Sequence, residues 1–293
     1  MVNVLTIDVE DYYMVSAFDD VVKIADWDQY SPRIEKYTQK LLDILEAHGT
    51  RGTFFVLGWV AEHYPHLVKE IASRGHEVGC HSNSHRMIYE MDAEEFARDT
   101  RRAKSIIEDV IGEEVWGYRA PSYSITRKSF WALEILADEG FRYDSSIFPI
   151  HHDRYGIPGF HRFPAVLDMG KGKRILEIPP STYRIFGCNV PVAGGGYLRL
   201  YPLAATEYAI QRLNGSEGKP AVVYVHPWEI DPEQPKMRGR MVSRLRHYMN
   251  LEKTEPRLNA LLNRFEFAPA RDVFSELLSQ LTTTKEVIEC AYS

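Results

Sequence analysis

Three acidic residues, Asp8, Glu10 and Asp11, lie within four positions of one another near the start of the chain. They follow an apolar run over residues 2–5, which we interpret as the first β-strand. Strands disfavour acidic residues, and carboxylates this close repel each other unless a positive charge lies between them. A surface loop would let these charges spread into water, but here they adjoin an apolar strand. A bound cation or a shared proton explains them better.

Two histidines four residues apart, His81 and His85, follow a predicted buried strand over residues 76–80. On a helical turn this spacing would place both imidazoles on one face, about 5–6 Å apart at Cβ. Two imidazoles and one carboxylate form a ligand set common at catalytic zinc sites, which keep a position open for water or substrate. An isolated pair of this spacing is more often a surface pair. Its position after a buried strand, together with the acidic cluster, favours a metal site.

Three further strands are predicted to end in charged or titratable residues, at Arg119, Asp144 and His226. Parallel α/β folds place their sites at the carboxyl ends of strands, so these side chains should gather beside the acidic cluster. Structural roles would be an ion pair, a turn cap and a core histidine, respectively. We favour functional roles, in which Arg119 keeps Asp8 ionised and oriented. Asp144 would bond His226 and stabilise its imidazolium, and His226 would act as a general acid.

The segment after the arginine supplies candidate substrate contacts. Pro121 fixes the local backbone and would direct the Ser122 amide toward a developing oxyanion. The aromatic residues Tyr12, Tyr123 and Trp228 are candidate platforms for a sugar ring, although core packing explains them equally well.

The elements that must position these residues follow from hydrophobic periodicity. Five strands alternate with helices over the first 145 residues, which predicts a parallel sheet with right-handed crossovers. Long loops follow over residues 146–200, with one strand candidate at 174–178 and room for a small antiparallel excursion. The remainder predicts helices over 202–214, 254–264 and 270–281, strands over 220–225 and 265–267, and a frayed tail after residue 282.

We therefore predict the α/β class, as a distorted (β/α) barrel of about seven parallel strands with long inserted loops and a C-terminal helical extension. A closed or nearly closed barrel fits better than two domains. We expect a single domain over residues 1–293, with a core over about 1–230 and the extension over about 231–293.

Local signals set the expected helix boundaries. Ser31 and Pro32 form an N-cap followed by proline at the first helical position. A second helix should run through residues 59–71 and stop at Gly75. Residues 92–95 form a capping box that opens a helix to about residue 111, and Thr126 should cap a helix ending near residue 140.

The chain has 293 residues, of which 44% are hydrophobic, so it can bury a sizeable core. Its formal net charge of -6 argues against nucleic-acid binding, which usually needs a basic face. The three cysteines are odd in number and far apart, which favours a reducing compartment. No apolar run approaches the roughly 20 residues of a membrane span, and the N-terminus lacks the features of a signal peptide. We expect a cytoplasmic protein.

The ordered motifs resemble carbohydrate esterase family 4, the polysaccharide deacetylases. The matching segments are residues 6–11 (TIDVED), 81–85 (HSNSH), 119–121 (RAP), 144–146 (DSS) and 223–226 (VYVH). Each motif alone is weak, but the ordered set is specific and covers roughly residues 1–230. The resemblance implies a distorted (β/α) barrel that hydrolyses N- or O-acetyl groups on sugars or polysaccharides. It also implies a divalent metal, with Zn²⁺ as the first choice and Co²⁺, Ni²⁺ or Mn²⁺ as alternatives.

Carried over residue by residue, the resemblance implies that Asp8 is the general base and that Arg119 pairs with it. His81 and His85 would be metal ligands, and the Ser122 amide would help to form an oxyanion hole. The general acid would be His226, tuned by Asp144.

One departure concerns the third metal ligand. The family commonly has two adjacent aspartates, the second of which binds metal, whereas Asp8 is followed here by Val9. If the strand persists, its alternation places Glu10 on the same side as Asp8. If the chain turns after Val9, Asp11 becomes the ligand. We favour Glu10.

Segments over residues 152–158, 191–196, 226–231 and 246–250 resemble a bacterial subgroup that accompanies exopolysaccharide synthesis and export. This implies a cytoplasmic enzyme acting on lipid- or nucleotide-linked sugar intermediates. Hydrolysis of a cyclic imide or small amide on the same fold is an alternative, and a non-catalytic sugar-binding protein is a third. The basic stretch over residues 236–247 is by default a solvated face, but it could instead contact substrate phosphates or a membrane surface.

Overall fold

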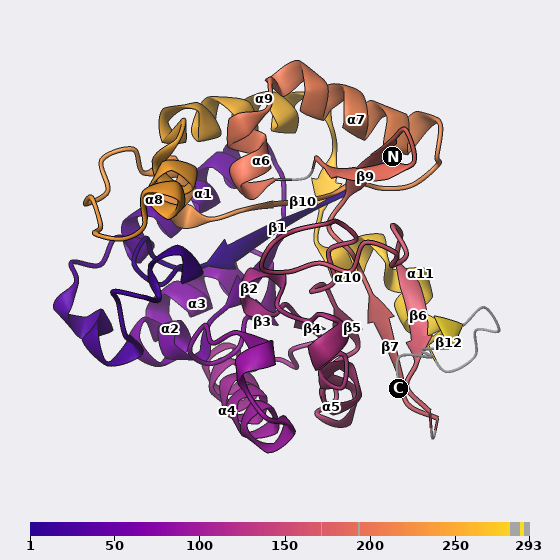
Figure 1. The fold of residues 1–293 in the computed structure, drawn as a ribbon, viewed down its shortest axis with the longest axis horizontal. Coiled ribbons are helices and arrows are strands. Elements are labelled where there is room, and N and C mark those ends of the chain that lie inside the picture. The colour runs from indigo at the N-terminus through magenta and orange to yellow at the C-terminus, as the bar shows by residue number, and fades with distance from the viewer. Residues whose placement is uncertain (171, 193, 282–287, 290–293) are drawn as a thin grey trace.

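The computed structural model describes residues 1–170, 172–192, 194–281 and 288–289. Its centre is a curled sheet surrounded by helices (Figure 1). The strand order is β10-β1-β2-β3-β4-β5-β7-β6-β12, with β11 beside β1. From β10 to β7 in this order, each strand is parallel to the next. Their bounds are Asn3–Val9 (β1), Thr53–Val56 (β2), Glu77–Cys80 (β3), Gly117–Tyr118 (β4), Tyr143–Asp144 (β5), Arg174–Glu177 (β7) and Val222–Val225 (β10).

These seven strands confirm the predicted distorted barrel of parallel strands. Within the described part of the chain the sheet ends at β10 and β12, so it is a half-barrel rather than a closed ring. The remaining strands of this sheet are β6 (Ala165–Asp168), β11 (Phe267–Ala268) and β12 (Ile288–Glu289). Because β6 is antiparallel to β7, and β8 (Thr182–Ile185) forms a hairpin with β9 (Cys188–Pro191), the predicted antiparallel excursion is present.

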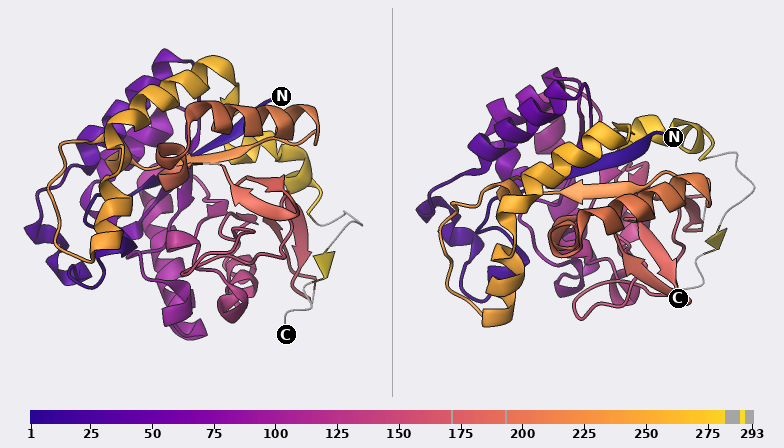
Figure 2. Two further views of the ribbon diagram at one scale, coloured as in Figure 1. Left: turned by 45° about the horizontal axis from the view of Figure 1, so that its top comes forward. Right: turned by 90° about the horizontal axis from the view of Figure 1, so that it is seen from above.

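Helices cover the outside of the sheet (Figures 1 and 2). The first half of the chain contributes α1 (Ile34–Ala47), α2 (Gly58–His63), α3 (Pro65–Ser73), α4 (Ala93–Ile111) and α5 (Ala132–Asp138). The second half contributes α6 (Gly195–Leu200), α7 (Leu203–Gly215), α8 (Met241–Tyr248), α9 (Thr254–Arg264), α10 (Ala270–Val273) and α11 (Ser275–Ser279). No helix in the described residues is both long enough and apolar enough to cross a membrane.

The central strand β1 is buried along its whole length. Its side chains Leu5, Ile7 and Val9 belong to the largest apolar cluster, which also holds the inner faces of α1, α3 and α4. On the opposite face of the sheet, Val4 belongs to a second cluster that includes Phe274 of the C-terminal extension. Strand alternation therefore leaves Thr6 and Asp8 on the inner side of the curl.

Several predicted boundaries are wrong for identifiable reasons. Helix α1 begins at Ile34 rather than at Pro32, because its first amides are bound by the distant Asp11 carboxylate. The helix predicted through residues 59–71 is broken in two at Tyr64, since Pro65 starts a new helix. The Thr126 cap opens only a short 3₁₀ turn before α5. The helix predicted over 270–281 is likewise broken, between α10 and α11.

Other local expectations are confirmed. Asp92 and Glu95 form the predicted capping box of α4, and Gly112 ends that helix in the left-handed conformation. The predicted helix over residues 254–264 is α9. Most of the tail after residue 282, which was expected to fray, lies outside the described residues.

Candidate active site

An arginine–aspartate pair lies buried at the inner face of the sheet. The Arg119 guanidinium donates from Nη1 to Asp8 Oδ1 at 2.7 Å and to Thr6 Oγ1 at 2.6 Å. Nη2 and Nε donate to the hydroxyl and carbonyl oxygens of Ser145 at 2.8 and 3.2 Å. The guanidinium also lies 4.4 Å from the centroid of the Phe55 ring. Arg119 is therefore fixed on several sides and orients Asp8, as expected; the sequence did not reveal the contributions of Thr6 and Ser145.

Three side chains converge beside this pair in an arrangement suited to a cation. Single ligand atoms of Glu10, His81 and His85 all lie within 4.8 Å of one another. The His81 Nδ1 atom lies 2.7 Å from the Arg119 carbonyl oxygen. Because a carbonyl can only accept, Nδ1 carries the proton and Nε2 keeps a free lone pair. The His85 Nε2 atom lies 2.8 Å from Glu10 Oε2.

These residues fit a divalent metal. Glu10 Oε2 is buried, and its 2.8 Å contact with His85 Nε2 is an ion-pair contact without hydrogen-bond geometry, so this oxygen accepts no hydrogen bond within the described part of the chain. A buried carboxylate oxygen is costly unless a hydrogen bond or a cation satisfies it. Two imidazole nitrogens and one carboxylate oxygen are a ligand set of catalytic zinc sites. The histidines do not lie on a helical turn as supposed, because the loop has positive φ at Ser82 (65°) and His85 (56°).

The alternative ligand, Asp11, has a different role. Its Oδ2 atom accepts the backbone N–H groups of Arg33 and Ile34 at 2.6 and 2.9 Å, and Oδ1 accepts that of Tyr12 at 2.8 Å. The carboxylate is thereby used to cap the start of α1. Since β1 persists to Val9, the geometry favours Glu10 and leaves Asp11 outside the cluster.

The charges of the cluster follow from burial and proximity. Burial disfavours the charge on Glu10, but His85, His226 and His81 hold the pKa of this carboxyl well below its usual range. Burial lowers the pKa of His81 to about 4, which keeps the imidazole neutral at pH 7, as a ligand must be. At His85, burial is outweighed by the Glu10 carboxylate, which raises the pKa.

A histidine–glutamate pair approaches the cluster from β10. The His226 Nδ1 atom donates to Glu229 Oε2 at 2.8 Å, and the same oxygen accepts the His226 backbone N–H at 3.1 Å. Nε2 therefore faces Glu10 Oε1 at 3.4 Å and Asp8 Oδ2 at 3.7 Å. Burial opposes a charge on His226, but Glu229, Glu10 and Asp8 together raise its pKa to about 9. Arg199 Nε in turn donates to Glu229 Oε1 at 2.8 Å.

The prediction that Asp144 bonds His226 is wrong. Asp144 ends β5, which is separated from β10 by four strands, whereas Glu229 follows His226 by three residues on the same turn. Asp144 accepts instead from the backbone N–H and hydroxyl of Ser146 at 3.1 and 2.5 Å. The Ser146 hydroxyl oxygen accepts the Ala120 N–H at 2.7 Å, so Asp144 braces the loop after Arg119.

The loop over Pro121–Tyr123 has an unusual backbone. Both Ser122 (φ 49°) and Tyr123 (φ 55°) adopt the left-handed conformation, which is costly for non-glycine residues and clusters at functional sites. The Ser122 hydroxyl lies 2.8 Å from that of Ser16. Tyr123 is buried among other aromatic rings, with its centroid 5.2 Å from that of Tyr224. The oxyanion role of the Ser122 amide stays a prediction.

Trp228 contacts the carboxylate of the cluster directly. Its indole Nε1 donates to Glu10 Oε1 at 3.2 Å. The ring stacks with those of His226 and His247, at centroid distances of 5.2 and 4.2 Å. Trp228 therefore orients Glu10, a role that the sequence did not reveal. Tyr12 is buried and packs in the core, with its hydroxyl donating to the Ser31 carbonyl at 3.4 Å.

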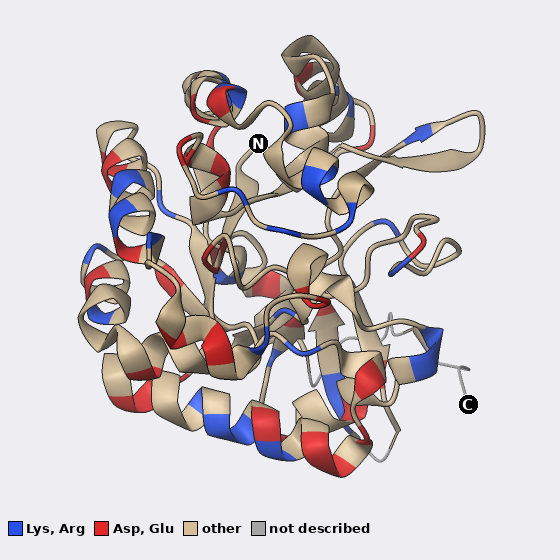
Figure 3. Cartoon of the chain, turned by 60° about the vertical axis from the view of Figure 1, so that its left-hand side comes forward, with Lys and Arg blue, Asp and Glu red and all other residues tan. Residues whose placement is uncertain are grey.

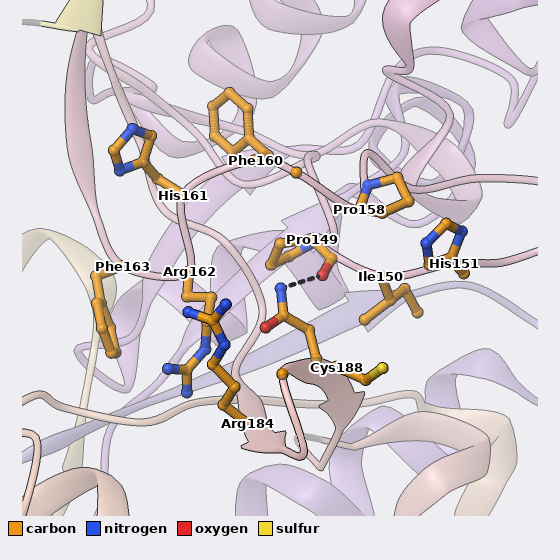
Figure 4. Close-up of a pocket in the computed structure, with 13 residues that line it drawn as sticks. Pro149, Ile150, His151, Pro158, Phe160, His161, Arg162, Phe163, Arg184 and Cys188 are labelled. Atoms are coloured by element: carbon orange, nitrogen blue, oxygen red, sulfur yellow. Dashed lines mark hydrogen bonds between the residues drawn. The ribbon is translucent and has the colours of Figure 1, made fainter.

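Part of this site borders a pocket of about 230 Å³. Its lining includes Glu10, His85, Ser122, Tyr123, His226 and Trp228. A larger pocket of about 650 Å³ lies between the loop over residues 149–163 and the β8–β9 hairpin (Figure 4). It contains none of the predicted site residues. The larger of the two pockets is therefore not the one lined by the candidate catalytic side chains.

Comparison with known proteins agrees with this geometry. The polysaccharide deacetylase family matches residues 7–143. Residues 7–143 are a polysaccharide deacetylase domain. A domain of unknown function, DUF3473, matches residues 145–275. The deacetylase domain thus holds Asp8, the three cluster residues and Arg119, while His226 and Glu229 come from the second matched region.

Individual relatives of the deacetylase domain are distant. A peptidoglycan-N-acetylglucosamine deacetylase from Bacillus cereus is 33% identical over 100 residues, which are 34% of this chain and 36% of that protein. The match thus spans about a third of the relative's length. A solved structure from Mycobacterium smegmatis, described as a candidate polysaccharide deacetylase, is 20% identical with a TM-score of 0.63, over 97% of this chain and 92% of that one. Puue allantoinase is 13% identical with a TM-score of 0.59, over 96% and 91%. Both structures show the shared fold.

Proposed function

We propose that this protein is a metal-dependent hydrolase that removes N-acetyl, or O-acetyl, groups from a polysaccharide or sugar intermediate. One observation carries the proposal. The Glu10, His81 and His85 ligand atoms converge within 4.8 Å, and the Asp8–Arg119 and His226–Glu229 pairs lie beside them. Such a constellation has the parts needed for metal-assisted hydrolysis.

The ligand set favours zinc. Glu10, His81 and His85 would hold the ion, and Trp228 and the Arg119 carbonyl would orient the first two. A bound Zn²⁺ would supply a Lewis acid for the acetyl carbonyl and lower the pKa of water. Mixed nitrogen and oxygen ligands also accept Co²⁺, Ni²⁺ and Mn²⁺.

Two residues of the protein, Asp8 and His226, carry out the two proton transfers. Asp8 is oriented by its contact with Arg119 and accepts a proton from the attacking water. His226 is held through Nδ1 by Glu229, so Nε2 is the atom that donates a proton to the leaving amine. The Ser122 amide stabilises the oxyanion. The carbon–nitrogen bond of the acetamide breaks, and acetate and the amino sugar are the products.

The sugar substrate is proposed from chemistry and from relatives. The Bacillus cereus relative is named for N-acetylglucosamine of peptidoglycan, which supports an N-acetylated hexosamine. Arg154 and Arg246 line the pocket beside the cluster, which favours a negatively charged sugar or one linked to phosphate. We assign the enzyme to exopolysaccharide biosynthesis in the cytoplasm, on lipid- or nucleotide-linked intermediates.

Hydrolysis of a cyclic imide or small amide is not favoured. That alternative was based on the replacement of the second aspartate by Val9. Because Glu10 lies beside His85 at 2.8 Å, a carboxylate is still available at the place where the pattern departs. The common fold with an allantoinase does not distinguish the two reactions.

The experiment measures metal content and acetate release on the same purified protein. We expect one divalent ion per chain and acetate release from N-acetylated glucosamine oligomers that stops on chelation and returns with Zn²⁺. The variant Asp11→Asn serves as the matched control, because it changes a neighbouring acid outside the cluster. A folded protein that binds no divalent ion, or that releases acetate equally well after complete chelation, would refute the proposal. Ring opening of a cyclic imide without acetate release would favour the alternative.

A further inference from the structure

Helix α8 exposes three neighbouring apolar side chains. Met241, Val242 and Leu245 are 84%, 60% and 62% exposed, respectively. Met241 and Leu245 are four residues apart and Val242 adjoins them, so all three share one face of the helix. We call these three residues the α8 apolar face. Single exposed apolar residues are ordinary, whereas a group of this kind marks a contact surface.

Basic residues are concentrated on α8 and in the segment just before it. The segment from residue 234 to residue 251 contains Lys236, Arg238, Arg240, Arg244 and Arg246 but no acidic residue, in a chain of net charge -6 (Figure 3). Arg240 is paired with Asp20 at 2.9 Å, and Arg246 lies 3.7 Å from Asp153. Across the described residues, Arg238 and Arg244 have no carboxylate partner within 4 Å. Two cations are thus available to an external anion.

The α8 apolar face and the available arginines together indicate which kind of partner binds this surface. A solvated face would explain the arginines but not the apolar side chains, and the same is true of a free phosphate ligand. In a symmetric dimer of this chain the α8 apolar face would meet its own copy, which would cover the apolar residues but bring arginines against arginines. We propose that the α8 apolar face and its arginines dock onto the surface of an anionic lipid bilayer, which matches both features.

The opposite face of α8 connects this surface to the catalytic pocket. Ser243, Arg246 and His247 line that pocket, and His247 stacks on Trp228 at 4.2 Å. A bilayer bound to the α8 apolar face therefore lies at the edge of the pocket. A sugar carried on a lipid phosphate could enter from that side. Membrane docking does not depend on the proposed deacetylation. The entry of a lipid-linked sugar into the pocket does depend on it.

The test measures sedimentation of the full chain with vesicles, without any substrate. Vesicles of phosphatidylcholine with 30% phosphatidylglycerol are compared with vesicles of phosphatidylcholine alone. We expect binding to the anionic vesicles only, weakened as NaCl is raised from 0.1 to 0.5 M. The double variant Arg238→Gln/Arg244→Gln should lower the affinity about tenfold or more. The triple variant Met241→Ser/Val242→Ser/Leu245→Ser should lower it by a similar factor.

Matched controls separate this surface from general charge and apolarity. Arg98→Gln/Arg102→Gln removes two exposed arginines from α4, and Phe186→Ser removes a fully exposed aromatic side chain from the β8–β9 hairpin. Both controls should bind vesicles as the unchanged protein does. If the triple variant does not fold, Met241→Ser and Leu245→Ser alone should each show a smaller loss.

Three outcomes would overturn the proposal. They are no binding to anionic vesicles, equal losses in the α8 variants and the controls, and a dimer of the unchanged protein that the triple variant abolishes. Vesicle binding with no acetate release would refute the proposed reaction but keep the docking. Acetate release without vesicle binding would refute the docking but keep the proposed reaction.

Discussion

Substitutions of the neighbouring acids Glu10 and Asp11 should have different effects, one on metal binding and the other on folding stability. Glu10 contributes one of the converging ligand atoms, and Asp11 accepts three backbone N–H groups at the start of α1. The two substitutions Glu10→Gln and Asp11→Asn remove the same charge at adjacent positions. We expect the first to abolish tight metal binding and the second to leave it intact.

The magnitudes follow from these contacts. Changes to groups that only orient a metal ligand cost about 10–100-fold in affinity, so loss of the Glu10 ligand itself should cost more than about 100-fold. Loss of a helix cap costs about 1–2 kcal/mol. With an unfolding entropy of about 2.1 cal/mol/K per residue, about 2 kcal/mol lowers the Tm of a chain of this length by about 3 °C. Asparagine keeps one accepting oxygen and replaces the other by a donor amide, so Asp11→Asn should lower the Tm by up to about that amount in the presence of chelator.

Two measurements on each variant test this reasoning. Titration with Zn²⁺ in competition with a chromophoric chelator gives the affinity, and calorimetry with and without chelator gives the Tm. Zinc should raise the Tm of the unchanged protein and of Asp11→Asn, but not of Glu10→Gln, because binding to the folded state alone is stabilising. If Asp11→Asn loses zinc and Glu10→Gln retains it, the ligand assignment is wrong.

Three other substitutions test separate parts of the structure. His226→Ala should lower kcat about 100- to 10,000-fold while metal affinity is unchanged, and unchanged turnover would remove His226 from the mechanism. Trp228→Phe deletes the indole N–H that donates to Glu10 and should lower zinc affinity about 10-fold or more, a prediction that equal affinities would contradict. Burial lowers the pKa of His76 from 6.5 to about 4. Between these values the unfolded chain binds more protons, so this stabilisation is complete above about pH 6.5 and declines as the pH falls toward 4. Chemical denaturation of His76→Gln should therefore show a shallower loss of stability over that interval, and an identical slope would exclude His76 as its source.

Much of the site could be predicted because strand ends in a parallel sheet meet at one edge. The alternation of β1 placed Asp8 and Glu10 on the same side, and neighbouring strands brought His81 and Arg119 beside them. These inferences use only the period of a strand and the direction of the sheet. The chain needed no unusual local geometry at these positions apart from the turn that carries His85.

The wrong predictions about the site concern the distance between strands across the sheet and the contacts made by individual side chains. Sequence order gives no measure of how far Asp144 lies from His226 across the sheet, and the sequence analysis assigned no role to the nearer Glu229. Asp11 was weighed as a metal ligand because nothing in the sequence connects it with the first turn of α1. That cap joins residues 22 or 23 positions apart, beyond the reach of local capping rules.

The position of β10 beside β1 explains why both matched regions contribute to one site. Val4–Ile7 of β1 pair with Val222–Val225 of β10, so the end of β10 must lie next to Asp8 and Glu10. His226 is the first residue after β10, and the turn that follows supplies both Glu229 and Trp228. The ligand cluster lies wholly within the deacetylase domain, which ends at residue 143. The second region supplies His226, the proposed proton donor, and the indole that orients Glu10. The proposed chemistry therefore needs residues from both regions, and the pairing of β1 with β10 is the physical link between them.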